Sequence, residues 1–136
     1  MTRDDAYRTD HAVVIGAGTA ALLAARLLAD RFARVTLVER AEIPSGHAAA
    51  GSHGHGLAAV ELDLRWRVST LGNVATLDVA AVEGLLGDGN DVRGVQLRTD
   101  GTISCLLADL VVDCTPPGHH RHSPRRCSRR SAAAVR

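Results

Sequence analysis

The sequence predicts an α/β protein with a partial parallel sheet and an antiparallel β-meander inserted before the last strand. Three observations predict this class. The short apolar run His11–Ile15 stops at Gly16, as a buried strand does before a tight turn. A stretch rich in Ala and Leu and then a second β-branched run follow, which is the order strand, helix, strand. Further along, alternating segments separated by Asp-Gly signals indicate antiparallel strands.

The first half of the chain reads as alternating strands and helices. The apolar periodicity predicts two helices, a strand after the first of them, and a glycine-rich loop before the second. In chain order these segments are the helix Ala20–Leu28, the strand Arg34–Glu39, the loop Ala41–Gly56 and the helix Leu57–Val68.

From Asn73 onward the pattern is that of a β-sheet. Val74–Leu86 reads as one long strand, or as two with a break near Ala80, and we expect it to open the meander. A final apolar run is expected to rejoin the parallel sheet. The later strands predicted are Val92–Arg98, Thr102–Leu106 and the returning Asp109–Asp113.

Length and charge suggest one domain between two polar ends. The chain has 136 residues, 46% of them hydrophobic, which is enough for a single core. We expect residues 1–10 and the Arg-rich segment 116–136 to be disordered and residues 11–115 to fold. The basic tail lacks interleaved aromatic residues, so nucleic-acid binding is not expected.

No targeting or metal-binding pattern stands out. There is no signal peptide and no apolar run that could span a membrane, so a cytoplasmic location is expected. The three cysteines have no C-x-x-C spacing, which argues against a disulfide framework or a zinc site. Cys105 and Cys114 are expected to be small core residues, and no catalytic residue is identified.

The segment Gly16-Ala17-Gly18-Thr19-Ala20-Ala21 fits the dinucleotide-binding pattern G-x-G-x-x-G/A between a strand and a helix. Gly16 permits the tight turn, and Gly18 lets a pyrophosphate approach the backbone. Ala21 is small enough for the helix to pack closely on the strand. The free N–H groups at the helix start, including those of Thr19 and Ala20, favour phosphate.

An acidic residue ends the second predicted strand. A carboxylate at Glu39 can accept hydrogen bonds from ribose hydroxyls, and it would repel a 2′-phosphate. NADP is therefore disfavoured, although the neighbouring Arg40 keeps it from being excluded. The sequence predicts that this unit holds the ADP half of FAD, with NAD as the alternative cofactor.

These residues resemble a known family. Val13–Gly18 with Val35–Arg40 is similar to the start of FAD-dependent oxidoreductases of the glutathione-reductase-like fold, in the branch of flavin monooxygenases and geranylgeranyl-reductase-like proteins. Gly51–Leu57 resembles a Gly-x-His-x-His-x-Leu segment of one bacterial branch, and Ala108–Thr115 resembles the return strand before an Ala-Thr-Gly motif. The resemblance implies a Rossmann-like FAD/NAD(P)-binding domain, with Thr115 near the flavin.

The sequence also departs from this family. Pro116 stands where the family has a glycine, and a stretch is missing between Leu57 and Val68. The second flavin-binding block and the substrate domain do not follow Thr115, and the tail resembles an out-of-frame reading of a GC-rich gene. These departures suggest a truncated, internally deleted relative.

Several alternatives stay open. His53 and His55 fit a plain loop better than a flavin contact or metal site, and the tail residues His119, His120, His122 and Cys127 fit a disordered segment better than a metal site. Asp113 is either a cofactor ligand or a cap on its strand. The protein is thus a FAD-dependent oxidoreductase reduced to its nucleotide-binding portion, a non-catalytic remnant, or a small NAD-binding module. Unpaired sheet edges favour self-association.

Overall fold

A computed structural model describes residues 10–43, 56–88 and 90–115 of the chain. Its centre is a four-stranded sheet with the strand order β3-β2-β1-β7. The four strands are β1 (His11–Ile15), β2 (Arg34–Val38), β3 (Val74–Leu77) and β7 (Leu110–Asp113). All three pairings are parallel, and β1 lies between β2 and β7. The predicted partial parallel sheet is confirmed.

The strands β1 and β2 form at the two runs of β-branched residues. Side chains on both faces of these strands are buried. Every residue of β1 is buried, as expected for a central strand of a parallel sheet that is covered on both sides. Two helices connect the first three strands, α1 (Thr19–Ala29) and α2 (Leu57–Ser69). Both predicted helices are confirmed, with ends that differ by at most one residue.

A separate three-stranded antiparallel sheet connects β3 to β7. Its order is β4-β5-β6, formed by β4 (Ala81–Gly87), β5 (Val92–Thr99) and β6 (Thr102–Leu107). The turn between β5 and β6 has positive φ at Asp100 and Gly101, which suits a tight hairpin. The predicted meander before the last strand is therefore confirmed.

One prediction about this region was wrong. Val74–Leu77 does not open the meander but forms β3, which pairs with β2 in the parallel sheet. The break falls at Asp78–Ala80, where Val79 has a φ of +53°. The residue pattern of a segment predicts a strand, but it does not predict the strand with which that segment pairs. Here the helix α2 returns the chain parallel to β2.

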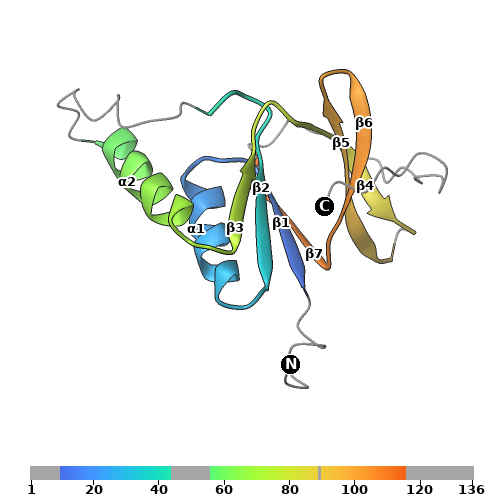
Figure 1. Cartoon of the computed structure of the whole chain (residues 1–136), viewed down its shortest axis with the longest axis horizontal. Helices are drawn as coiled ribbons and strands as arrows, with labels where there is room; N and C mark the ends of the chain where they lie inside the picture. Colours follow the sequence, from blue (N-terminus) through green and yellow to red (C-terminus); the bar gives the residue numbers. More distant parts are fainter. Residues whose placement is uncertain (1–9, 44–55, 89, 116–136) are drawn as a thin grey trace.

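The molecule has three layers (Figure 1). The helices α1 and α2 cover one face of the parallel sheet, and the antiparallel sheet covers the other. Alternate residues of β1 serve the two cores, because neighbouring side chains of a strand point to opposite faces. Ala12 and Val14 face the helices, whereas Val13 and Ile15 face the antiparallel sheet.

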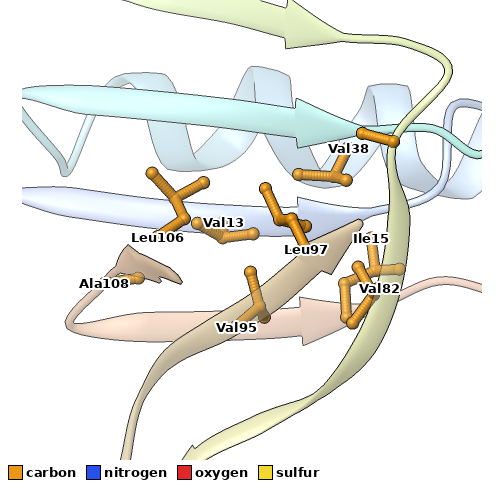
Figure 2. Packing of buried hydrophobic residues seen from close by; sticks show 9 residues of the cluster. Val13, Ile15, Val38, Val82, Val95, Leu97, Leu106 and Ala108 are labelled. Atoms are coloured by element: carbon orange, nitrogen blue, oxygen red, sulfur yellow. The ribbon is translucent and has the colours of Figure 1, made fainter. Parts of the chain in front are cut away.

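The core between the two sheets is built from small and medium aliphatic side chains. Figure 2 shows Val13 and Val38 of the parallel sheet directed toward Val95 and Leu97 of β5. Val13 and Val95 are fully buried. Because this packing fixes the meander on one face, it leaves the carboxyl ends of β1, β2 and β7 as the edge at which a ligand site can form.

Some predictions concern residues outside the described part of the chain. They are the disorder of residues 1–9 and 116–136 and most of the predicted loop, residues 44–55. Residues 41–43 have no regular secondary structure, in agreement with the loop prediction.

Candidate functional site

The predicted site residues come together at one edge of the parallel sheet. The Gly16 N–H donates to the carbonyl of Val38 at 2.8 Å, which ties the glycine-rich turn to the end of β2. The Cys114 N–H donates to the carbonyl of Ile15 at 2.9 Å, which ties the end of β7 to the end of β1. The turn thus lies between the segments that carry Glu39 and Thr115.

Gly16 adopts a backbone conformation that favours glycine. Its φ is +114°, a region that residues with a side chain rarely occupy. A Cβ placed there would lie 3.5 Å from the Cys114 carbonyl oxygen and 3.6 Å from the Ala21 Cβ. Backbone conformation, more than crowding, therefore requires glycine here, as the sequence predicted for the tight turn.

Gly18 differs from Gly16 in a way that bears on function. It precedes α1 with an extended backbone (φ −76°, ψ −174°), which any residue can adopt. Among the residues that the structure describes, a Cβ added to Gly18 would meet nothing within 4 Å. Neither the fold nor the backbone conformation requires glycine at this position. The space beside Gly18 leaves room for a group that approaches the backbone closely.

The start of α1 presents unpaired donors. The first backbone bond of the helix runs from the Leu22 N–H to the Gly18 carbonyl at 3.0 Å. Within the described part of the chain, the N–H groups of Gly18, Thr19 and Ala20 have no acceptor. No acidic side chain lies in the first turn of the helix, so its positive end is not neutralised locally. These donors and this charge suit an anion.

Ala21 lies where the helix meets the sheet. It is 1% exposed and belongs to the core formed with Ala12 and Val14 of β1. A larger side chain would push α1 away from the strand, as predicted for the third position of the motif.

Glu39 is held at the end of β2 by its backbone. Its N–H donates to the Leu77 carbonyl at 2.8 Å, and its carbonyl accepts from the Ala80 N–H at 3.0 Å. One carboxylate oxygen, Oε1, accepts from the Ala41 N–H at 3.0 Å. Arg40 follows on the exposed surface. Glu39 therefore directly follows Val38, whose carbonyl binds the glycine-rich turn, and its carboxylate is held by the Ala41 N–H.

The segment after β7 forms a small polar turn. Asp113 Oδ1 accepts hydrogen bonds from both the backbone N–H and the hydroxyl of Thr115, so Asp113 caps the end of its strand. This is one of the two roles that the sequence left open for it. Burial, and then the charge of Asp113, raise the pKa of Cys114, which disfavours a thiolate at this thiol.

Sequence reasoning missed one residue that reaches the turn. Arg65 lies on α2, and its Nη2 donates to the Ala17 carbonyl at 2.9 Å. The same nitrogen lies 2.9 Å from Glu61 Oε1, one turn earlier on the helix. Arg65 and Ala17 are 48 positions apart, and no motif in the sequence links them.

No metal centre is found among the described residues, where no group of three or more His, Cys, Asp or Glu side chains could hold an ion. Cys105 is a buried core residue as expected, and Cys114 is half-buried at the end of β7. His53, His55, Pro116 and the histidines and cysteine of the tail lie outside the described residues.

Comparison with known proteins agrees with this geometry. Residues 14–77 match the family model of the NAD(P)-binding Rossmann-like domain. The chain has a Rossmann-like fold. The match runs from the end of β1 through α1, β2, α2 and β3, and so includes the glycine-rich turn and Glu39. The sequence has no significant match among the curated proteins.

Solved structures with a similar fold include several reductases. Thioredoxin reductase from Streptococcus pyogenes superposes with a TM-score of 0.62 at 18% identity, over 81% of this chain and 32% of that one. A ferredoxin reductase from Rhodopseudomonas palustris gives 0.55 at 27% identity, over 79% and 24%. Bacillithiol disulfide reductase from Bacillus cereus gives 0.53 at 22% identity, over 82% and 30%.

These comparisons support a Rossmann-like fold but not the finer branch. The resemblance to monooxygenases and geranylgeranyl-reductase-like proteins stays a prediction. The chain spans between 24% and 32% of the length of these three proteins. No helix in the described ranges is long and apolar enough to cross a membrane.

Proposed function

We propose that this protein binds the ADP moiety of a dinucleotide, with FAD as the first candidate. One observation carries the proposal. The unpaired N–H groups at the start of α1 lie beside Gly18, where the backbone is open to close approach. Backbone donors at a helix N-terminus, after a glycine-rich turn at the carboxyl end of a parallel strand, are the usual site of a pyrophosphate.

Each predicted residue has a place in this proposal. Gly16 makes the turn, Gly18 admits the pyrophosphate, and Thr19 and Ala20 supply helix N–H groups. Ala21 keeps α1 close to β1. Glu39 accepts hydrogen bonds from the ribose hydroxyls through the carboxylate oxygen that does not serve Ala41. Arg40 is the nearby cation, and Thr115 is placed toward the flavin side.

A bound flavin or nicotinamide would supply hydride-transfer chemistry, and this chain would bind and orient it. The described residues form one β-α-β-α-β mononucleotide-binding unit, β1 to β3, with β7 beside it. A dinucleotide fold of this type uses two such units. We therefore infer that affinity comes mainly from the ADP half. The dissociation constants for ADP and FAD should then agree within about threefold.

Titration calorimetry with ADP, FAD and NADH tests the proposal. The informative variant is Gly18→Ala, because its methyl group would meet none of the described residues and should leave the fold intact. The matched control is Gly72→Ala, where a Cβ also meets nothing within 4 Å. We expect Gly18→Ala to weaken ADP binding about tenfold, whereas Gly72→Ala leaves it unchanged.

Absence of binding by the wild-type chain would contradict the proposal and favour the non-catalytic remnant. The NAD-binding alternative rests on the match of residues 14–77 to the NAD(P)-binding domain. Binding of NADH at least about tenfold tighter than FAD would favour it. Flavin absorbance in the purified protein would favour FAD.

A further inference from the structure

We propose that Arg65 is a positioning residue, which from α2 holds the glycine-rich turn in its nucleotide-binding conformation. The inference rests on the proposed function and deepens it, because it assigns the control of the turn to a residue outside the fingerprint. Its basis is the hydrogen bond from Arg65 Nη2 to the Ala17 carbonyl at 2.9 Å.

The Ala17 carbonyl has no partner within α1. The first helix bond accepts at the Gly18 carbonyl, one residue later, so the guanidinium of Arg65 takes the place that a helix N–H would have. Ala17 is 4% exposed, and a carbonyl in such a position needs a partner. A charged donor satisfies it with a strong hydrogen bond.

The peptide between Ala17 and Gly18 transmits this contact to the ligand side. In a trans peptide the carbonyl and the following N–H point in opposite directions, and the described chain has no cis peptide bond. Once the carbonyl is held toward α2, the Gly18 N–H must point away from α2. That N–H is one of the unpaired donors of the proposed phosphate site.

Arg65 is itself held in place. Its ion pair with Glu61 spans one helical turn, and the Arg65 side chain is only 24% exposed. Arg67 provides a natural comparison on the same helix. It makes a similar pair with Asp63 at 2.8 Å, but its side chain is 71% exposed, and its described contact stays within α2.

The test compares Arg65→Met with Arg67→Met. Two measurements are made on each: the dissociation constant for ADP, and the backbone amide resonance of Gly18 in the ligand-free protein. We expect Arg65→Met to move the Gly18 resonance and to weaken ADP binding about tenfold. Arg67→Met should change neither. The urea midpoint of each variant shows whether the fold is retained.

Arg65→Lys and Arg67→Lys carry the test if Arg65→Met does not fold. Lysine keeps the charge but cannot reproduce the planar donor set, so Arg65→Lys should weaken ADP binding by about threefold and shift the Gly18 resonance. Wild-type affinity with an unchanged Gly18 resonance in a folded Arg65 variant would overturn the inference alone. A change in affinity without a shift in the free protein would also overturn it, because Arg65 would then contact the phosphate directly. Failure of the wild-type chain to bind ADP, FAD and NADH would overturn the proposed function as well.

Discussion

The Nε2 atom of His11 lies 2.7 Å from the hydroxyl oxygen of Thr36, where β1 and β2 begin to pair. The other ring nitrogen, Nδ1, lies 2.7 Å from the Leu107 carbonyl. A carbonyl can only accept, so Nδ1 carries the proton and neutral His11 accepts from Thr36 at Nε2. One imidazole therefore joins both sheets at the end opposite the nucleotide site.

This arrangement predicts how stability depends on pH. Burial is the main cause that lowers the pKa of His11, and Arg34 acts in the same direction, while the Leu107 carbonyl and Asp109 oppose them. The unfolded chain then takes up a proton near its ordinary pKa of 6.5, before the folded chain does. The stability that neutral His11 contributes is therefore fully present above pH 6.5. It is lost as the pH falls from there through the lowered pKa of His11 in the folded chain.

Urea unfolding at a series of pH values between about 5 and 8 would measure this effect. We expect His11→Gln to flatten the decline in the free energy of unfolding on the acid side. An equally steep decline in the variant would show that other groups cause it.

Gly94 lies in β5, and we expect the fold to be sensitive to its substitution. Its φ is +151°, and an added Cβ would lie 2.2 Å from the Leu106 carbonyl oxygen on the neighbouring strand. The backbone of β6 cannot move aside without breaking the ladder. We expect Gly94→Ala to lower the free energy of unfolding by about 2 kcal/mol or more. Urea unfolding checks this, with Gly72→Ala as the control that should stay within about 0.5 kcal/mol.

Val79 offers the opposite case. It is a β-branched residue with a φ of +53°, in the link between β3 and β4. Such strain costs about 1–3 kcal/mol, whereas glycine costs at most about 1 kcal/mol in unfolded-state entropy. The side chain is 51% exposed, so little packing is lost. Val79→Gly should therefore raise the thermal midpoint, and Val92→Gly, at an exposed valine of β5 without a positive φ, should lower it.

Glu39 is expected to set the preference between nucleotides. Its carboxylate would repel a 2′-phosphate, and Glu39→Gln removes that charge while keeping an oxygen for the Ala41 N–H. We expect the ratio of NADPH to NADH affinity to rise about tenfold in the variant, as measured by fluorescence titration. Asp78→Gln provides a control, since Asp78 accepts from the Ile43 N–H at 3.1 Å in the nearby loop. An unchanged ratio in Glu39→Gln would contradict the role assigned to Glu39.

We expect the protein to self-associate through the outer strand β3. Its far edge carries unpaired backbone groups within the described sheet, and Ala75 is exposed there. Light scattering after size exclusion should show a mass that rises with concentration. Ala75→Lys should reduce this rise because a charge on an edge opposes strand pairing, whereas Ala59→Lys on α2 should leave it unchanged. A constant monomer mass in the wild type would contradict the prediction.

The sequence alone could predict β1, α1 and β2, because an apolar run, a glycine turn and a helix-forming stretch agree over His11–Val38. It could not place Val74–Leu77. Strand-forming residues look alike in both sheets, and only the packing of α2 fixes the parallel pairing with β2. The same holds for the site. Gly16, Gly18 and Glu39 follow from a local motif, but Arg65 reaches Ala17 from a distant segment and no spacing reveals it.

The pairing of β7 with β1 has a consequence for folding kinetics. Val13 pairs with Val111, so the parallel sheet is complete only when segments near the two ends of the described chain pair. In contrast, the pairings among β1, β2 and β3 and those of the β4-β5-β6 sheet join segments that are closer in sequence. Contacts between distant segments slow folding. We therefore expect two locally formed units to arise first, with docking of β7 and of the core between the sheets as the late step. Mutations at Val111 should then speed unfolding more than they slow folding.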